Sequence, residues 1–313
     1  MPISGGATVR HCLRTAVLLL LAACSGSTEP KPDTRQTPIM FRSSRSGQSG
    51  IFLMSADGGR VVPFGPGDGA WPGDWSPSGA QLVFTRRNPT NIWIANVDGT
   101  GLRQLTSASW PTDLPRWMPN GSAISYADFS DGSDWGIAAV NVDGSGAHRV
   151  PNTFRADGDH SWSPDGRRLV YALDETVPIT GTTGYKDVLS LFVADTTAAV
   201  PVRLTTNTDC GDWQPEWSPD GTKIAFASCA NSLASIVVIA PDGTGRVALT
   251  DGRTLDKHPS WSPDGTRIVF ERGEGTGADI WMMSADGTNQ VNLTASNPDF
   301  DGNPVWRRAL LPD

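Results

Sequence analysis

The sequence is poor in the residues that would point to catalysis or nucleic-acid binding. Its 313 residues include four histidines and four cysteines, and 33 acidic residues outweigh 25 basic ones to give a net charge of −8. A basic surface for phosphate is therefore not expected, and nucleic acid is excluded as a partner. The chain also lacks the Gly-x-Ser-x-Gly motif of a hydrolase nucleophile, any Cys/His spacing typical of zinc, and almost all helical periodicity.

The one concentrated apolar run is too short to span a bilayer, and it lies near the N-terminus. Ala16–Ala23 follows two arginines, which is the arrangement of a secretory signal peptide. The run ends in Leu-Ala-Ala-Cys, which resembles the bacterial lipobox. We therefore expect a signal peptide over 1–23, lipidation of Cys24 and a polar, flexible tether over 24–37. An ordinary secretory signal is the alternative. Ser25, where an inner-membrane retention signal would have Asp, favours the outer membrane.

A motif of Trp followed by a Ser-Pro-Asp-Gly-like turn recurs at a period of about 45 residues. Its tryptophans are Trp75, Trp117, Trp162, Trp217 and Trp261, and a sixth, Trp306, keeps the upstream residues but not the turn. An alternating apolar strand follows each turn, then a strand that often ends in Asp-Gly, then a short strand that often ends in Leu-Thr. Each repeat is thus predicted to be four short antiparallel strands. The repeat tryptophans are predicted to pack between neighbouring units.

The first repeat begins in its middle. Ile39–Ser43 matches the second strand of the later units, and the first strand that it lacks matches the segment around Trp306. We therefore predict an all-β, six-bladed β-propeller over 38–313, closed by pairing the C-terminal strand with three N-terminal strands. Closing the ring removes exposed sheet edges.

These repeats resemble the WD40-like (PD40) repeats of TolB-like propellers. The shared pattern is I-x-F-x-S-x-R-x-G, I-F-x-M-x-x-D-G, L-T and D-x-x-P-x-W-S-P-D-G, and it covers residues 38–307. The resemblance implies the propeller fold and a place in the bacterial cell envelope, because TolB is the periplasmic protein of the Tol–Pal system. In TolB an α/β domain precedes the propeller, whereas here only the tether lies between Cys24 and the first repeat.

Candidate binding residues lie on the first strand of each repeat, which lines the central channel of a propeller. Five positions before each tryptophan stand Ala70, Thr112, Asp157, Asp212, Asp256 and Asp301, and Asp113 lies one place along in the second repeat. We expect a partial ring of carboxylates near one mouth, which would attract a cation or a basic peptide. Alternatively, each Asp hydrogen-bonds backbone amides of its own loop.

Aromatic and histidine side chains come from the same region. Trp71, Trp110 and Trp213 could contact a peptide, stack on a sugar or pad the tops of the blades. His160 and His258 lie near the inner strands of the third and fifth blades, either as channel residues or as metal ligands.

Two further features concern single blades. The segment Leu173–Asp187 lengthens the third blade, either as a partner-binding loop or as a tolerated insertion. Cys210 and Cys229 flank the hairpin of the fourth blade, and we expect them to form a disulfide.

The sequence supports two functional hypotheses. The first is a lipid-anchored, non-catalytic monomer that binds an envelope protein or peptide, in the periplasm at the outer membrane, without a cofactor. The second is a carbohydrate-binding protein or a metal-dependent polysaccharide-active enzyme that uses the channel. A Ca²⁺ ion in the acidic channel is compatible with either.

Overall fold

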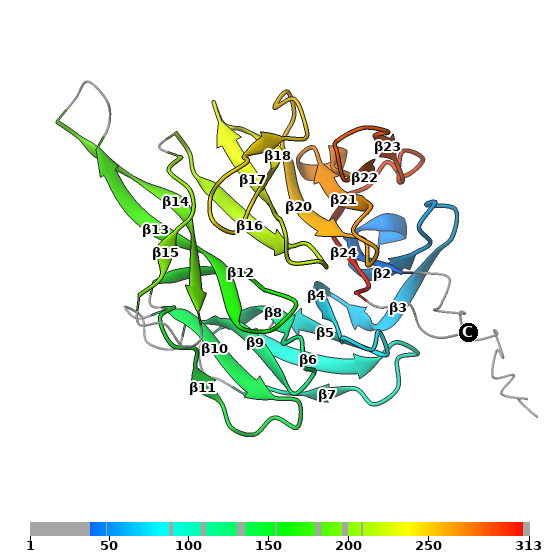
Figure 1. Ribbon diagram of the computed structural model, residues 1–313. Coiled ribbons are helices and arrows are strands. Elements are labelled where there is room, and N and C mark those ends of the chain that lie inside the picture. The colour runs from blue at the N-terminus through cyan, green and yellow to red at the C-terminus, as the bar shows by residue number, and fades with distance from the viewer. Residues whose placement is uncertain are drawn as a thin grey trace, which may run out of the picture. The chain divides into compact units, whose positions relative to one another are not determined.

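The computed structural model describes residues 38–47, 49–87, 90–107, 111–129, 135–153, 155–178, 183–195, 200–207 and 209–308. Within them the chain forms six four-stranded antiparallel sheets, the blades, arranged around a central channel (Figure 1). The described helices are two single 3₁₀ turns, η2 (Arg45–Gly47) and η3 (Gly275–Gly277). No helix in these ranges is long and apolar enough to cross a membrane.

The first three blades follow each other along the chain. Blade 1 consists of β4 (Ala70–Trp75), β5 (Gln81–Arg86), β6 (Asn91–Asn96) and β7 (Arg103–Gln104). Blade 2 consists of β8 (Thr112–Trp117), β9 (Ala123–Asp128), β10 (Gly136–Asn141) and β11 (His148–Arg149). Blade 3 consists of β12 (Ala156–Trp162), β13 (Arg168–Pro178), β14 (Tyr185–Asp195) and β15 (Val202–Arg203).

Blades 4 and 5 repeat this order, and blade 6 joins the two ends of the chain. Blade 4 consists of β16 (Asp212–Trp217), β17 (Ile224–Ala230), β18 (Leu233–Ile239) and β19 (Val247–Ala248). Blade 5 consists of β20 (Asp256–Trp261), β21 (Arg267–Arg272), β22 (Asp279–Ser284) and β23 (Val291–Asn292). Blade 6 consists of β24 (Asp301–Trp306) followed by β1 (Ile39–Ser43), β2 (Gly50–Met54) and β3 (Val61–Asp68).

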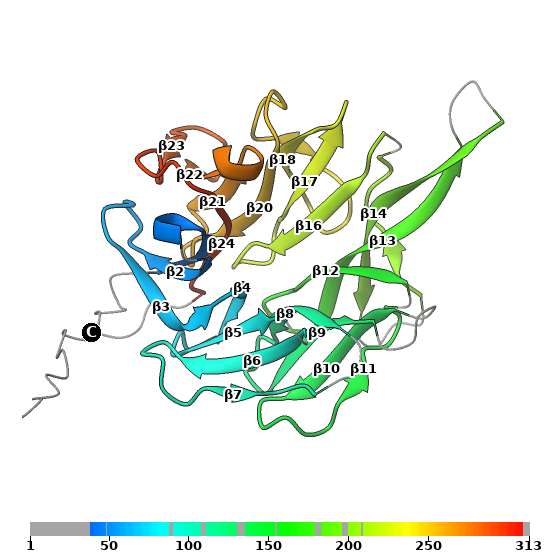
Figure 2. The same cartoon turned by 180° about the vertical axis from the view of Figure 1, so that it is seen from behind.

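The strand that the N-terminal repeat lacks is supplied by β24. It pairs antiparallel with β1, with Trp306 opposite Ile39 and Asp301 opposite Ser43. Seen from both sides, the C-terminal strand lies beside the N-terminal ones (Figures 1 and 2). The ring is therefore closed by backbone hydrogen bonds between segments from opposite ends of the chain.

The Ser-Pro-Asp-Gly turns form because each residue type satisfies part of the hairpin. In blade 4 the Ser218 hydroxyl donates to Asp220 (2.6 Å) and accepts from the Lys223 backbone N–H (2.9 Å). Gly221 takes a φ of +72°, which side chains with a Cβ rarely adopt. The hydrogen bond from Ser218 is the main reason why the pKa of Asp220 is lowered. The repeated turn thus fixes the register of the first two strands.

The core lies between blades, and each repeat tryptophan is part of it. The six side chains are between 0% and 5% exposed. Trp217, for example, packs with Val170 and Leu191 of blade 3, and Trp306 packs with Val269 and Ile280 of blade 5. The predicted inter-blade packing of these tryptophans is therefore what the structure shows.

Blade 3 carries a β-arm where a loop was expected. The segment Leu173–Asp187 is largely strand: β13 and β14 stay paired through eleven positions, from Arg168 opposite Asp195 to Pro178 opposite Tyr185. The arm extends past the edge of the ring (Figures 1 and 2). It presents Tyr185, which is 69% exposed. Residues 179–182 of the insertion lie outside the described residues.

Candidate functional site

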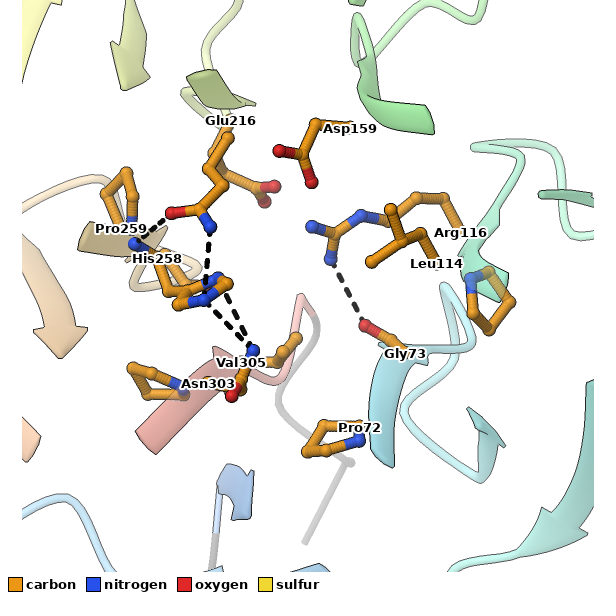
Figure 3. Close-up of a pocket in the computed structure, with 14 residues that line it drawn as sticks. Pro72, Gly73, Leu114, Arg116, Asp159, Glu216, His258, Pro259, Asn303 and Val305 are labelled. Atoms are coloured by element: carbon orange, nitrogen blue, oxygen red, sulfur yellow. Dashed lines mark hydrogen bonds between the residues drawn. The ribbon is translucent and has the colours of Figure 1, made fainter. Parts of the chain in front are cut away.

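Every inner strand contains a register shift just before its tryptophan. In β16 the shift lies between Trp213 and Glu216, and in β20 between Lys257 and Ser260. Such a bulge leaves one residue unpaired and re-aims its side chain. The residues at these positions line the channel: Pro72, Leu114, Asp159, Gln214, His258 and Asn303. We call this set the bulge ring (Figure 3).

The bulge ring is held in an unusual backbone conformation. Leu114, Gln214, His258 and Asn303 have φ values of 52° to 56°, although none is glycine. Each precedes a proline, which ordinarily favours extended backbone. Non-glycine residues with positive φ cost free energy and gather at functional sites. The strained backbone therefore marks the bulge ring as a candidate functional site.

His258 is fixed by amide groups of the two neighbouring blades. Its backbone N–H donates to Gln214 Oε1 (2.8 Å), and its Nε2 lies 3.1 Å from both Gln214 Nε2 and Asn303 Nδ2 (Figure 3). Both amide nitrogens are donors, so Nε2 is an acceptor and the ring is neutral. Burial lowers the pKa of His258 to about 3, with the Lys257 charge adding to the effect. This histidine thus stays uncharged at physiological pH.

Charged side chains fill the rest of the channel. Arg116 donates from Nη1 to the Gly73 carbonyl (3.1 Å) and faces Asp159 (Figure 3). Burial raises the pKa of Asp159 to about 6, against the opposing effect of Arg116. From the other end, Arg308 Nη2 lies 3.2 Å from Asp74 Oδ2 and 3.9 Å from Glu216 Oε1.

This packing leaves little free space in the channel. The cavity bounded by the bulge ring, Arg116 and Glu216 has a volume of about 40 Å³, which is room for a few water molecules. A peptide or sugar could not enter it without displacing the charged network. A ligand of that size would therefore have to bind outside this cavity.

The two mouths differ in chemistry. At the tryptophan end of the inner strands, a hollow of about 230 Å³ is ringed by the turn prolines Pro77, Pro119, Pro164, Pro219 and Pro263; we call this the proline mouth. At the other end, the residues before the bulge ring include Trp71, Asp113, Trp213 and Lys257. We call this the bulge mouth.

Three of the predicted channel carboxylates are buried in ion pairs instead of facing the channel. Asp212, Asp256 and Asp301 are each 0% exposed. Asp256 accepts two hydrogen bonds of 2.8 Å from Arg272, Asp301 pairs with Arg45 (2.8 Å), and Asp212 pairs with Arg246 (3.4 Å). Besides these arginines of the same blade, each accepts a hydrogen bond from a polar side chain of the preceding loop: Asn207, Thr254 and Asn297. These three residues therefore do not present an open negative ring.

Asp157 does not occupy the same inner-strand position as those three aspartates. In blade 3 it is Ala156, opposite Leu173, that occupies the position of Asp212, opposite Ser228. The inner strand has one extra residue in its bulge, where Gly158 takes a φ of +106°. Asp157 is consequently half-buried beside Asp159, and burial, then Asp159 and Asp174, raise its pKa to about 7.

The two candidate histidines lie in different places. His258 is in the channel, but His160 is 1% exposed between blades 2 and 3. Its Nε2 lies 2.7 Å from Ser125 Oγ and its Nδ1 lies 2.6 Å from the Gly158 carbonyl. Burial lowers its pKa to about 3. His160 is thus a packing residue, and its placement at a channel mouth was wrong.

Of the remaining candidates, three lie at the bulge mouth, two form a disulfide and two lie outside the described residues. Trp71 and Trp213 are half-buried at the bulge mouth, and half-buried Asp113 accepts the backbone N–H of Leu114 (2.8 Å). Cys210 and Cys229 are joined by a disulfide, with Cα atoms 5.3 Å apart. Trp110 and Cys24 lie outside the described residues.

The sequence prediction missed most of the channel residues. Arg116, Asp159, Gln214, Glu216 and Asn303 were not among the candidates. A signal for their position was present, because a proline stands two residues before the tryptophan in four repeats. A proline within a strand indicates a bulge.

The family is shown by comparison with known sequences. The profile described as "PD40: TolB beta propeller domain" matches residues 15–164 and 115–310. The chain belongs to this family. As a member of the PD40 family, it is 30% identical to "Protein TolB homolog" of Chlorobium chlorochromatii over 178 residues, which are 56% of this chain and 36% of that protein.

Two further comparisons give other proteins to which this PD40 propeller is similar. "Dipeptidyl-peptidase 5" of Porphyromonas endodontalis is 28% identical over 111 residues, which are 33% of this chain but 16% of that protein. The crystal structure of TolB from Acinetobacter baumannii superposes with a TM-score of 0.69 at 18% identity, covering 86% of this chain and 66% of that one. The likeness at 18% identity shows the propeller fold alone. The matched sequence relatives are longer proteins, of which this chain spans a minor part.

In the described part of this PD40 propeller, the arrangement of histidines and acids bears on metal binding. Among the described residues, no group of three or more His, Cys, Asp or Glu side chains is arranged to hold a metal ion. The nearest approach is His258 Nε2, 3.9 Å from Glu271 Oε2. That carboxylate already accepts the Asn303 backbone N–H (2.9 Å), and its other oxygen pairs with Lys257 (3.2 Å).

Proposed function

We propose that this protein is a lipid-anchored, non-catalytic propeller of the bacterial cell envelope that binds a protein or peptide partner at its bulge mouth. The observation that carries the proposal is the charged packing of the channel, which leaves about 40 Å³ free. A binding surface of half-buried aromatic and charged side chains lies directly outside it. Trp71 and Trp213 supply the large, rigid contact area that protein interfaces favour.

The cell-envelope location rests on the family and on the sequence around Cys24. A TolB-type propeller belongs to the envelope, and a lipidated Cys24 would hold this one at a membrane. We propose that this is the outer membrane, with the propeller in the periplasm. The tether joins the propeller at Pro38, whose carbonyl accepts the Arg307 N–H (2.7 Å) beside the proline mouth. The bulge mouth is therefore at the end of the ring away from Pro38.

The β-arm of blade 3 extends this surface. β13 begins at the proline mouth and continues past Leu173, which pairs with the start of the inner strand at the bulge mouth. The arm is braced by the ion pair of Glu175 with Arg203 (2.8 Å). Its exposed Tyr185 is available to the same partner.

The test is affinity capture of the tagged full-length protein from crosslinked, detergent-solubilised envelopes, identified by mass spectrometry. A partner captured by the wild type and reduced by Trp213→Ala supports the proposal. The control is Trp281→Ala, which removes another half-buried tryptophan from the third strand of blade 5. Equal capture by all three proteins would place the partner elsewhere on the surface, and absence of any partner would contradict the proposed function.

The anchor is tested separately. Mass spectrometry of the N-terminal peptide should show acyl chains on Cys24 in the wild type. The Cys24→Ser variant should lose them and fractionate away from membranes. A mature N-terminus elsewhere, without acylation, would contradict the anchor and would leave partner binding to be judged by the capture experiment.

A further inference from the structure

The bulge mouth contains a cluster of three arginines that belongs to no ion pair. Arg42 comes from β1, Arg86 ends the second strand of blade 1, and Arg87 follows that strand. Arg42 and Arg87 meet over Trp71, where blade 6 adjoins blade 1. The guanidinium of Arg86 lies over Trp93 (4.9 Å) and donates to the Pro66 carbonyl. Within the described ranges, no carboxylate lies at ion-pair distance from any of the three.

Trp71 organises the cluster. The guanidinium of Arg42 lies 3.8 Å from the centre of its ring, and that of Arg87 lies 4.4 Å from it. Arg42 is also held by Ser49, which accepts from Nη2 (2.8 Å). Two cations over one indole are prearranged, and the aromatic face offsets part of their repulsion. Arg87 remains exposed at the surface.

Some of the donors in the cluster are unused. The Nε atoms of Arg42 and Arg86 are buried and have no hydrogen-bond partner. Buried donors are ordinarily satisfied, and because these two have almost no accessible surface, a ligand from outside would first meet the exposed guanidinium of Arg87. Guanidinium groups suit carboxylates, to which they can donate two parallel hydrogen bonds.

The side of the same mouth formed by blades 2 and 3 carries acidic side chains. Asp113 and Asp157 come from the inner strands of blades 2 and 3, and Asp174 lies close to Asp157. A polymer with a carboxylate on every unit would be repelled there. A peptide with an acidic group at one end and a basic group at the other matches both sides.

We propose that Arg42 and Arg87, stacked on Trp71, form a carboxylate-binding site for an acidic residue of a peptide segment in the partner. This inference rests on the proposed function and names the chemistry of the partner. Arg42 and Arg87 donate to the carboxylate. Trp71 holds both guanidinium groups in place and contacts the apolar part of the peptide.

The test uses the full-length protein in detergent micelles and a fluorescein-labelled peptide, acetyl-Asp-Asp-Gly-Ser-Gly-Ser-Lys-Lys. The control peptide has Asn in place of both Asp and so lacks the two carboxylates. By fluorescence anisotropy the wild type should bind the Asp peptide at least about tenfold more tightly than the Asn peptide, as charge-assisted hydrogen bonds require. Arg87→Gln should lose about tenfold for the Asp peptide and little for the Asn peptide. Arg87 is exposed, so this variant should fold even if Arg42→Gln does not.

Arg167→Gln, an exposed arginine of the turn beside the proline mouth, is the matched control and should bind like the wild type. Equal affinity for the two peptides, no binding of either, or unchanged binding by Arg87→Gln would overturn the site. Tighter, Arg87-dependent binding of a polyglucuronate oligomer would show a polysaccharide ligand and overturn the peptide. If Arg87→Gln still captures the envelope partner like the wild type, the inference fails while the proposed function stands.

Discussion

Replacing Trp306 by alanine tests how the ring is closed. Trp306 is 3% exposed and lies in the C-terminal strand that completes blade 6. Its side chain packs on Val269 and Ile280 of blade 5 and on Ile39 of blade 6. A buried tryptophan removes about 200 Å² from water, which corresponds to about 5 kcal/mol at 25 cal/mol per Å². Measured Trp→Ala losses in cores are about 3–5 kcal/mol.

The substitution isolates the side chain because the backbone contacts can persist. The Trp306 N–H donates to Ser260 Oγ (3.0 Å), and the strand register with Ile39 does not depend on the indole. Urea unfolding of the full-length protein, followed by circular dichroism, gives the free energy of unfolding. We expect Trp306→Ala to lower it by about 3–5 kcal/mol and Trp306→Phe to lower it by less than half as much. A loss under about 1 kcal/mol for the alanine variant would refute the role of this side chain in joining blades 5 and 6.

Three further outcomes are expected. Cys229→Ser, which opens the 19-residue link to Cys210, should lower the free energy of unfolding by about 3 kcal/mol; an unchanged urea midpoint would contradict this. Asp256→Ala should cost about 3 kcal/mol, because it removes the buried carboxylate that pairs with the half-buried Arg272 guanidinium, and a loss as small as that of an exposed substitution would show that water replaces the carboxylate. For Asp157, burial raises the pKa to about 7, so its stabilising contribution is full below its unfolded pKa and is lost as pH rises through about 7. Asp157→Asn should therefore stabilise the protein relative to wild type more at pH ~8 than at pH ~5, and the reverse order in parallel urea titrations would contradict that assignment.

The fold was predictable because its signals repeat. Six copies of a Trp motif, five of them followed by a turn of Ser-Pro-Asp-Gly type, mark the same strand pair six times. The strands of a repeat with a weak pattern could therefore be assigned by comparison with the other repeats. The fragment beginning at Ile39 could be completed from Trp306, and the structure places those two residues opposite each other.

The site was less predictable because it depends on what differs between repeats. Counting five residues back from each tryptophan assumes one bulge length, and the extra residue at Gly158 breaks that count in blade 3. The burial of Asp301 depends on Arg45, which is 256 residues away in sequence. No periodic pattern reports such a partner.

Channel residues illustrate the same limit. The positive φ of Leu114 and Gln214 follows from the bulge and is not favoured by their residue types. His160 and His258 both lie just before a repeat tryptophan, but His160 is two residues before Trp162 and His258 is three residues before Trp261. A difference of one position in the bulge sends one into the channel and the other between blades.

The central claim is that a partner docks on the bulge mouth. The most direct measurement is photo-crosslinking in intact cells from a benzophenone amino acid placed at position 213, in the bulge mouth, or at position 167, beside the proline mouth. We predict a discrete crosslinked protein from position 213, diminished by Arg87→Gln, and none of that size from position 167. The same adduct from position 167 alone, or from neither position, would contradict the account.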